Sequence, residues 1–316
     1  MKKFVLSVVA ATAFAAPALA ADLPTKAPVV PVAASPWDLA FGSAIMNDYV
    51  FRGITQSNHK PSVAAYFEPR YNINPNLQLY AGISGESISF ANRAAAEIDL
   101  YGGIRPTIDK FAFDFGFWYY GYPGGTCYNS VIAGCQPTLA NGNVIKGNLS
   151  FWEVYGKVTW TPIDPLALGL NEYYTPSFLH SGAWGNYFSG TVKYTGTTTI
   201  KDIGWYVSGE LGRQWLGTTD SFYSLGAGLG AGGIKYANYN TWNVGIGFTW
   251  KVLTLDLRYS DTDLSRGNCN AFTSDFTAPA TGPDVTPINP AGGGSKWCGA
   301  AFIAKLSADL TLANLK

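Results

Sequence analysis

The sequence predicts an all-β protein, a single transmembrane antiparallel up-and-down β-barrel of about twelve strands. Three observations predict it: segments of alternating apolar and polar residues, a composition poor in charge, and a leader typical of exported proteins. Alternating segments of about ten residues suit strands that cross a bilayer at a tilt. One face of such a strand meets lipid and the other meets the lumen.

The clearest of these segments is FAFDFGFWYY, residues 111–120. Strand side chains alternate between two faces, so every second residue belongs to the same row. One row is wholly apolar: Phe111, Phe113, Phe115, Phe117 and Tyr119. The other row contains Asp114 and the small residues Ala112 and Gly116. A soluble strand of average length ends after about 5 or 6 residues, whereas this alternation continues for about ten, enough to span a membrane.

Residues 1–20 have the layout of a secretory signal peptide. Lys2 and Lys3 precede an apolar run that is too short for a transmembrane anchor, and Ala18-Leu19-Ala20 predicts cleavage after Ala20. Residues 21–36 are rich in proline and predict an extended periplasmic linker. The remaining domain, residues 37–316, is the predicted barrel.

Charge is scarce and balanced. Removal of the leader with its two lysines leaves 19 basic and 21 acidic residues, a net charge of −2, so no nucleic acid partner is expected. Charged residues form 13% of the chain, against about 25% in soluble domains. Beyond the leader, no apolar run reaches the length of about 18 residues that a spanning helix requires. These features leave two classes, a secreted β protein and an outer-membrane barrel.

The aromatic residues favour the barrel. The predicted strands are 37–46, 61–71, 76–86, 95–105, 111–121, 149–160, 165–174, 186–195, 203–213, 239–250, 252–262 and 299–310, joined alternately by short turns and long loops. Rings on the apolar faces gather near the short turns: Trp37, Tyr71, Phe111, Trp160, Tyr194, Trp205 and Trp250. Others gather near the long loops: Tyr119, Trp152, Trp242 and Tyr259. Two aromatic belts are typical of bilayer interfaces, whereas a sandwich core would hold such rings in its middle.

A specific motif follows the first predicted strand. The residues are Asn47-Asp48-Tyr49-Val50-Phe51-Arg52-Gly53-Ile54-Thr55-Gln56-Ser57, followed by Lys60-Pro61. Near the other end, Tyr259-Ser-Asp261-Thr-Asp263-Leu264 precedes Cys269. These stretches resemble the TorF-type porins of proteobacterial outer membranes, a conserved family of unknown function. The resemblance implies a barrel in the bacterial outer membrane. Its expected partners are outer-membrane lipid, the outer-membrane assembly machinery, and small hydrophilic solutes or ions.

The polar rows of the strands supply candidates for the lining of a pore. These candidates are Arg52, Glu68, Arg70, Glu97, Asp99, Arg105, Asp114, Lys193, Asp256 and Arg258. Two interpretations remain open, because such residues either face a solute or form cross-strand salt bridges that brace the barrel. Arg52 is expected to face the lumen if it continues the alternation of the first strand. It then serves as a clamp that ties the first hairpin to the wall, or as a selectivity residue.

Four cysteines in an exported chain predict disulfides. Cys127, Cys135, Cys269 and Cys298 allow three pairings, and the two local pairs, 127 with 135 and 269 with 298, are preferred. Zinc requires further ligands, and only two histidines, His59 and His180, are present. The sequence therefore predicts neither a metal nor a cofactor.

These observations predict a passive channel for small hydrophilic solutes and no enzymatic activity. Lumen charges of mixed sign predict weak ion selectivity with at most a mild cation bias. One alternative is a non-conducting structural or surface-interaction barrel, because the long loops 122–148 and 263–298 are able to plug the lumen. A second alternative is an outer-membrane lipid hydrolase built on His180-Ser181. Adjacent loop residues rarely form such a catalytic pair.

Overall fold

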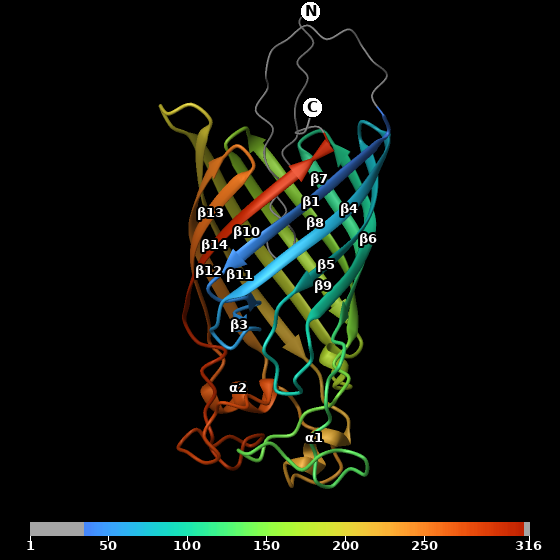
Figure 1. The fold of residues 1–316 in the computed structure, drawn as a ribbon, viewed down its shortest axis with the longest axis vertical. Coiled ribbons are helices and arrows are strands. Elements are labelled where there is room, and N and C mark those ends of the chain that lie inside the picture. Colours follow the sequence, from blue (N-terminus) through green and yellow to red (C-terminus); the bar gives the residue numbers. More distant parts are fainter. Residues whose placement is uncertain (1–34, 313–316) are drawn as a thin grey trace, which may run out of the picture.

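Twelve antiparallel strands form one closed barrel, which confirms the predicted fold class. The computed structural model describes residues 35–312 (Figure 1). The predicted signal peptide, residues 1–20, and most of the predicted linker lie outside the described residues. Each strand pairs with its neighbours in the sequence, and β1 (Trp37–Met46) closes the barrel by pairing with both β4 (Ser62–Asn74) and β14 (Ala301–Thr311). Closure leaves no strand edge unpaired, which is the condition for a sheet that spans a bilayer.

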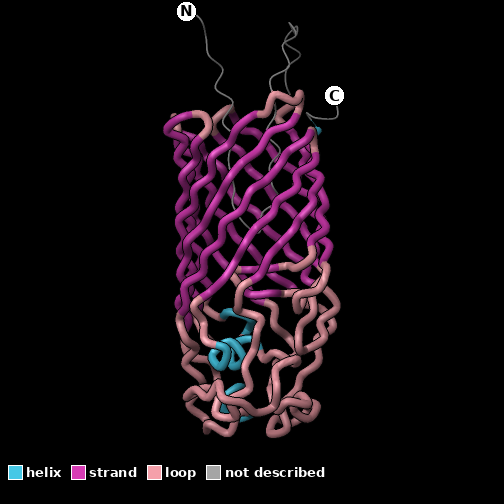
Figure 2. Tube along the Cα trace, turned by 90° about the vertical axis from the view of Figure 1, so that its left-hand side faces the viewer, coloured by secondary structure: helices cyan, strands magenta, loops and turns pink. Residues whose placement is uncertain are grey.

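The predicted strands are all present, with ends displaced by a few residues. The remaining barrel strands are β5 (Leu77–Glu86), β6 (Glu97–Ile108), β7 (Phe111–Gly121), β8 (Phe151–Ile163), β9 (Leu166–Thr175), β10 (Gly185–Thr197), β11 (Ile203–Leu216), β12 (Tyr239–Trp250) and β13 (Leu253–Thr262). Short turns join them at one end and long loops at the other (Figures 1 and 2). We call these ends the short-turn end and the loop end.

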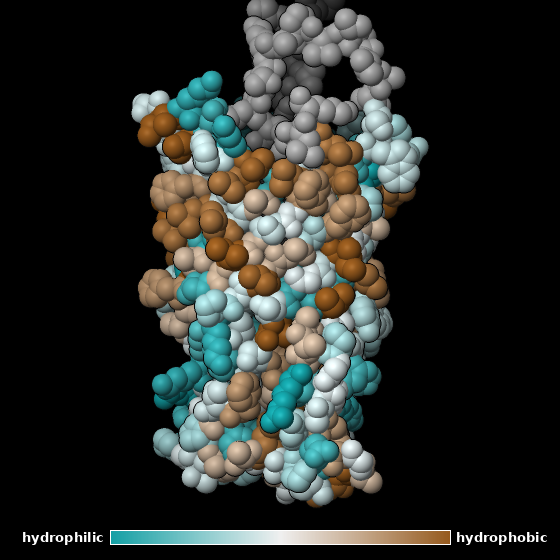
Figure 3. All heavy atoms as spheres, viewed as in Figure 1, coloured by the Kyte–Doolittle hydropathy of each residue, from teal (hydrophilic) through white to brown (hydrophobic). Residues whose placement is uncertain are grey.

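The apolar rows face outward and the polar rows face the lumen. In β7, Phe115 and Phe117 are 47% and 43% exposed, whereas Asp114 and Tyr120 are 6% and 3% exposed. The outward rings include Trp37, Tyr71, Trp152, Trp160, Tyr194 and Trp250. Apolar side chains gather over the barrel wall toward the short-turn end, and polar ones over the loops (Figure 3). Among the described residues, no helix has the length and apolar character to cross a membrane.

The long loops fold together over the loop end, and their apolar side chains form one continuous core with the inward rings of the barrel strands. The loops contain the short helices η1 (Phe178–His180), α1 (Ser221–Gly226) and α2 (Arg266–Thr273). The core includes Phe90, Ile145, Leu149, Phe178, Leu216, Tyr223, Tyr236, Phe272 and Trp297. Both preferred disulfides form, Cys127–Cys135 and Cys269–Cys298, and each lies within a single loop. We refer to this assembly of loops as the loop cap.

A small hairpin that the sequence did not predict lies between β1 and β4. It consists of β2 (Val50–Phe51) and β3 (Ile54–Thr55), joined by Arg52 and Gly53. Both turn residues have positive φ, +48° and +79°, as a two-residue type I′ turn requires. A Cβ on Gly53 would lie 2.3 Å from Thr262 Cγ2, so glycine is also needed for the close approach to β13. The hairpin is buried at the loop end, where Ile54 is 6% and Thr55 1% exposed.

Candidate functional site

The barrel encloses a cavity of about 290 Å³ to which all twelve strands contribute. Its walls carry Tyr66, Asp99, Lys157, Glu210, Asp256 and Lys305, and hairpin residues 50–53 border it on one side. A second cavity, of about 50 Å³, lies between the hairpin and the loop cap and is lined by Phe51, Ile54, Phe178, Phe272 and Trp297. Hairpin β2–β3 thus separates a polar lumen from an apolar cap.

Arg52 fastens the tip of this hairpin to the barrel wall. Its guanidinium donates two hydrogen bonds to Glu153 of β8, of 2.8 and 2.7 Å, and a third of 3.1 Å to Gln214 of β11. The same group lies 4.8 and 4.5 Å from the ring centroids of Tyr173 and Tyr187. Such bidentate, ring-flanked arginine contacts are strong and directional. The alternation had suggested that Arg52 faces the lumen by continuing the first strand. Arg52 does reach the lumen, but from the turn of the hairpin.

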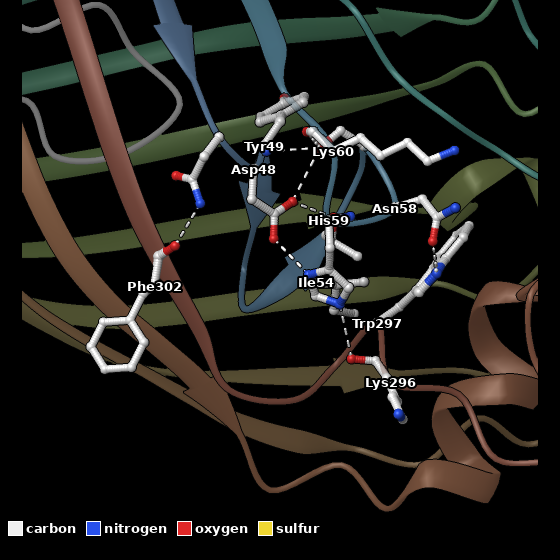
Figure 4. Close-up of polar contacts among 12 residues, drawn as sticks. Asp48, Tyr49, Ile54, Asn58, His59, Lys60, Lys296, Trp297 and Phe302 are labelled. Atoms are coloured by element: carbon white, nitrogen blue, oxygen red, sulfur yellow. Dashed lines mark hydrogen bonds and ion pairs between the residues drawn. The ribbon is translucent and has the colours of Figure 1, made fainter.

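The base of the hairpin is held by the carboxylate of Asp48, which is 2% exposed (Figure 4). Asp48 accepts hydrogen bonds from Thr55 Oγ1 and Ser57 Oγ, at 2.5 and 3.1 Å, and its Oδ2 lies 2.7 Å from His59 Nδ1. The hydrogen bond to Asp48 holds the pKa of His59 above its usual value. This side chain lies in a connecting turn, outside the barrel strands.

The same segment is tied to the last loop of the chain. His59 Nε2 lies 3.2 Å from the Lys296 carbonyl, and Trp297 Nε1 donates to Asn58 Oδ1 at 2.9 Å (Figure 4). In addition, Thr55 N donates to the Trp297 carbonyl at 2.9 Å. We call these contacts between residues 48–60 and 296–298 the latch. The motif that carried the family resemblance therefore builds the hairpin and its attachments.

Four of the predicted lumen residues form an ion network in one wall toward the short-turn end. Arg105 donates to Glu68 at 2.8 and 3.2 Å and lies 3.4 Å from Asp114 Oδ2. Arg70 donates to Glu68 at 2.6 Å. Because β4, β6 and β7 supply these residues, the network braces the wall across β5 between them.

A second network lines the cavity itself. Arg258 donates two hydrogen bonds to Asp256, of 3.0 and 2.9 Å, and one of 2.6 Å to Asn243. Lys193 Nζ lies 4.2 Å from the ring centroid of Tyr206, whose hydroxyl donates to Asp256 at 2.6 Å. Both signs of charge therefore face the same water-accessible space.

The last two predicted residues, Glu97 and Asp99, form a cluster of acids with Glu86, which the sequence analysis did not single out. One carboxylate oxygen of each lies within 4.8 Å of the others. The alternation of β5 indicates that Glu86 faces the lumen, because Gln78, Tyr80 and Ser84 share its face. Glu86 was not named as a candidate because it is the last residue of the predicted strand 76–86. Gln214 was missed for a similar reason, since β11 continues to Leu216, beyond the predicted end at residue 213.

The pair His180-Ser181 does not adopt the arrangement that the hydrolase alternative needs. Ser181 is 2% exposed, and its hydroxyl donates to the Phe178 carbonyl at 2.6 Å. The His180 carbonyl accepts a hydrogen bond from Lys146 at 2.8 Å. The Ser181 hydroxyl thus stabilises the turn of its own loop.

The closed sheet, the apolar exterior and the polar interior define a β-barrel of the outer-membrane type. Its family can be stated as well. The chain belongs to the Gcw_chp family, described as a bacterial protein of unknown function, whose model matches residues 31–282. That match includes the hairpin and every barrel strand except β14. The description does not mention porins, so the resemblance to TorF-type porins stays a prediction.

Several solved structures match the chain over most of its length, at low sequence identity and low TM-score. An outer-membrane channel from Pseudomonas putida F1 is 10% identical, with 90% of this chain and 100% of that chain covered and a TM-score of 0.43. The NanC porin is 9% identical, with 87% and 100% covered and a TM-score of 0.42. LpxR from Salmonella typhimurium is 13% identical, with 86% and 99% covered and a TM-score of 0.38. No curated protein matches the chain in sequence.

Proposed function

We propose that this protein is an outer-membrane channel for the passive diffusion of small hydrophilic solutes, held closed here by hairpin β2–β3. The observation that carries the proposal is the cavity of about 290 Å³, which is lined by charged side chains of both signs and bordered on one side by hairpin residues 50–53. Barrels of twelve strands lie between filled eight-stranded barrels and open porins of sixteen or more, so their interior has room for a narrow path.

The hairpin is suited to be the moving part. Only two residue pairs join its strands, Val50 with Thr55 and Phe51 with Ile54, and its sheet is separate from that of the barrel. Its displacement would leave the barrel ladder intact and join the cavities on its two sides. Each disulfide lies within one loop, so the loops of the described chain are joined to one another by non-covalent contacts only.

The charges of the cavity support weak ion selectivity. Lys193, Asp256 and Arg258 line the same space, so the wall presents no continuous field of one sign. Strong anion or cation selectivity requires rings of like charge. Diffusion through this lumen would therefore discriminate mainly by size.

A non-conducting structural barrel is the second candidate, and the packed loop cap favours it. Conductance of the refolded protein in a planar lipid bilayer tests both. We expect rare, brief openings of the unmodified protein, and longer or more frequent openings of Arg52→Ala, because the tip of the hairpin loses its attachment to Glu153.

Arg213→Ala is the matched control for this experiment. Arg213 precedes Gln214 in β11, is exposed, and donates to Asn240 at 3.0 Å, so its loss leaves the hairpin untouched. Membranes that stay silent with the unmodified protein and with Arg52→Ala contradict the channel and support the structural barrel. Equal effects of both substitutions contradict the role of the hairpin.

A further inference from the structure

Three carboxylates face one another on the inner surface of two adjacent strands. Glu86 of β5 lies directly opposite Glu97 of β6, and Ser84 lies opposite Asp99. One oxygen from each acid lies within 4.8 Å of the other two. Like charges that lie directly opposite in a sheet destabilise it. The arrangement therefore requires compensating positive charge, which either bound protons or a cation can supply.

Other acids in the lumen have arginine as the source of that charge. Glu68 pairs with Arg70 and Arg105, Glu153 with Arg52, and Asp256 with Arg258. The ion pairs found within residues 35–312 do not include any of the three clustered acids. Their hydrogen-bond donors are neutral hydroxyls: Tyr49 and Tyr122 donate to Glu97 at 2.8 and 3.0 Å, and Ser84 donates to Asp99 at 3.1 Å.

Two oxygens of the cluster are buried without any partner. Asp99 is 3% exposed, and neither its Oδ1 nor Glu86 Oε2 accepts a hydrogen bond from the described part of the chain. Trp118 Nε1, on the neighbouring strand β7, acts on the Asp99 carboxylate outside normal hydrogen-bond geometry, and a single N–H neutralises no charge. Buried polar atoms of native proteins are nearly always satisfied by protein, water or an ion. The unpartnered oxygens thus point to a ligand that supplies positive charge.

The donor set fits a hard divalent cation. Three carboxylate oxygens within 4.8 Å of one another suit calcium, which takes about 6–8 oxygen ligands in flexible geometry. Magnesium demands near-ideal octahedral geometry and usually binds through only one or two carboxylates, so three carboxylates favour calcium. Glu86 and Asp99 border the lumen cavity, which offers an entry path and room for the water ligands that calcium also uses.

We propose that Glu86, Glu97 and Asp99 bind a divalent cation of the calcium type in the wall of the lumen. The ion would leave the cluster with one net negative charge in place of three. Glu97, held by Tyr49 and Tyr122 and only 2% exposed, forms the inner side of the site, and the other two acids face the cavity. This inference concerns ion binding alone and does not depend on whether the barrel conducts.

Calorimetric titration tests the proposal on the full chain, refolded in a nonionic detergent and freed of metal with EDTA. We expect saturable binding of one Ca²⁺ per chain, with weaker binding of Mg²⁺ added as competitor. Glu97→Gln and Asp99→Asn should weaken Ca²⁺ binding by about tenfold or more, because affinity in such sites follows the number of charged ligands.

Glu210→Gln is the matched control. Glu210 also faces the cavity and accepts hydrogen bonds from Tyr187 and Asn243, at 2.9 and 3.1 Å, but lies outside the acid cluster. This variant should bind Ca²⁺ as the unmodified protein does. The proposal is overturned if the unmodified protein shows no saturable binding, or if Glu97→Gln binds as tightly as Glu210→Gln.

Thermal unfolding distinguishes a lost site from a misfolded variant. In EDTA, Glu97→Gln should unfold at a higher temperature than the unmodified protein, because one of three repelling charges is removed. At a Ca²⁺ concentration that just saturates the unmodified protein, the added Ca²⁺ should raise its unfolding temperature clearly more than that of Glu97→Gln. A Ca²⁺ response of equal size in both proteins would overturn the proposal.

Discussion

The two ends of the barrel use buried arginine in different ways. Toward the short-turn end, arginines and carboxylates of the barrel strands pair across the wall, as Arg105 does with Glu68 and Asp114. Toward the loop end, a separate hairpin enters the lumen and is fastened at its tip by Arg52 and at its base by the latch. Both ends use buried arginine–carboxylate pairs. The pair Arg105–Glu68 joins strands of the barrel sheet itself. The pair Arg52–Glu153 instead holds the hairpin, whose sheet is separate from that of the barrel.

This difference predicts that equivalent pairs have unequal effects on global stability. Replacement of a residue in the wall network leaves buried charges unpaired inside the folded sheet. Replacement of Arg52 also leaves Glu153 unpaired. In this case, however, the hairpin can move away from the barrel wall, so that water reaches the Glu153 carboxylate. Stability of the barrel and mobility of the hairpin should thus respond separately.

The largest effect is expected from Glu68→Ala in the wall network. Glu68 is 1% exposed and accepts hydrogen bonds from both Arg70 and Arg105. Removal of one partner from a buried ion pair destabilises by about 3–5 kcal/mol. Urea unfolding of the refolded protein should show this loss. Asp164→Asn, in an exposed turn, is the control, and a loss no larger than that of the control would contradict the role of the network.

A smaller global effect and a large local one are expected from Arg52→Ala. Amide hydrogen exchange should accelerate in residues 47–60 by about 100-fold, since loss of hydrogen bonds to a charged group changes local opening by about 2–3 kcal/mol. Exchange in β4 to β14 should stay close to that of the unmodified protein. Uniform acceleration of exchange through all barrel strands would show that the hairpin and the barrel unfold together. It would contradict the expectation that they respond separately.

The smallest effect is expected from pH, through His59 in the latch. Asp48 raises the pKa of this ring in the folded state, so the stabilisation is complete below the unfolded pKa and is lost as pH rises through the folded pKa. The ring is 37% exposed, which limits the contribution to about 1 kcal/mol or less. The protection factors of the amides of residues 55–60, which are corrected for the base-catalysed rise of the intrinsic exchange rate, should therefore fall on going from pH 6 to pH 9. His59→Gln should remove this fall in protection, and its persistence would assign the fall to another group.

Much of the fold could be predicted from the sequence because each barrel strand is long enough to show its alternation. Residues 111–120 define an apolar and a polar row without any knowledge of their neighbours. The hairpin could not be predicted in this way, since its strands have two residues each and two residues show no period. Its signal was the Arg52-Gly53 turn, which requires positive φ, between residues that resemble an ordinary strand.

The lumen residues could be predicted individually but not as partners. Arg105 contacts Glu68 across an intervening strand, and this depends on the stagger of β4, β5 and β6. The expectation of no metal was based on the scarcity of histidine and the pairing of cysteine, which are zinc ligands. It did not weigh carboxylates that adjacent strands bring together, because the register of Glu86 with Glu97 appears only in the folded sheet.

The latch has a consequence for biogenesis. It joins residues 48–60, which emerge early during translocation, to residues 296–298, which emerge late, just before the strand β14 that closes the barrel. The base of the hairpin therefore cannot be fastened until residues 296–298 have arrived. In a partly assembled barrel the hairpin would not yet be fastened across the lumen. Its attachment would coincide with closure of the barrel by β14.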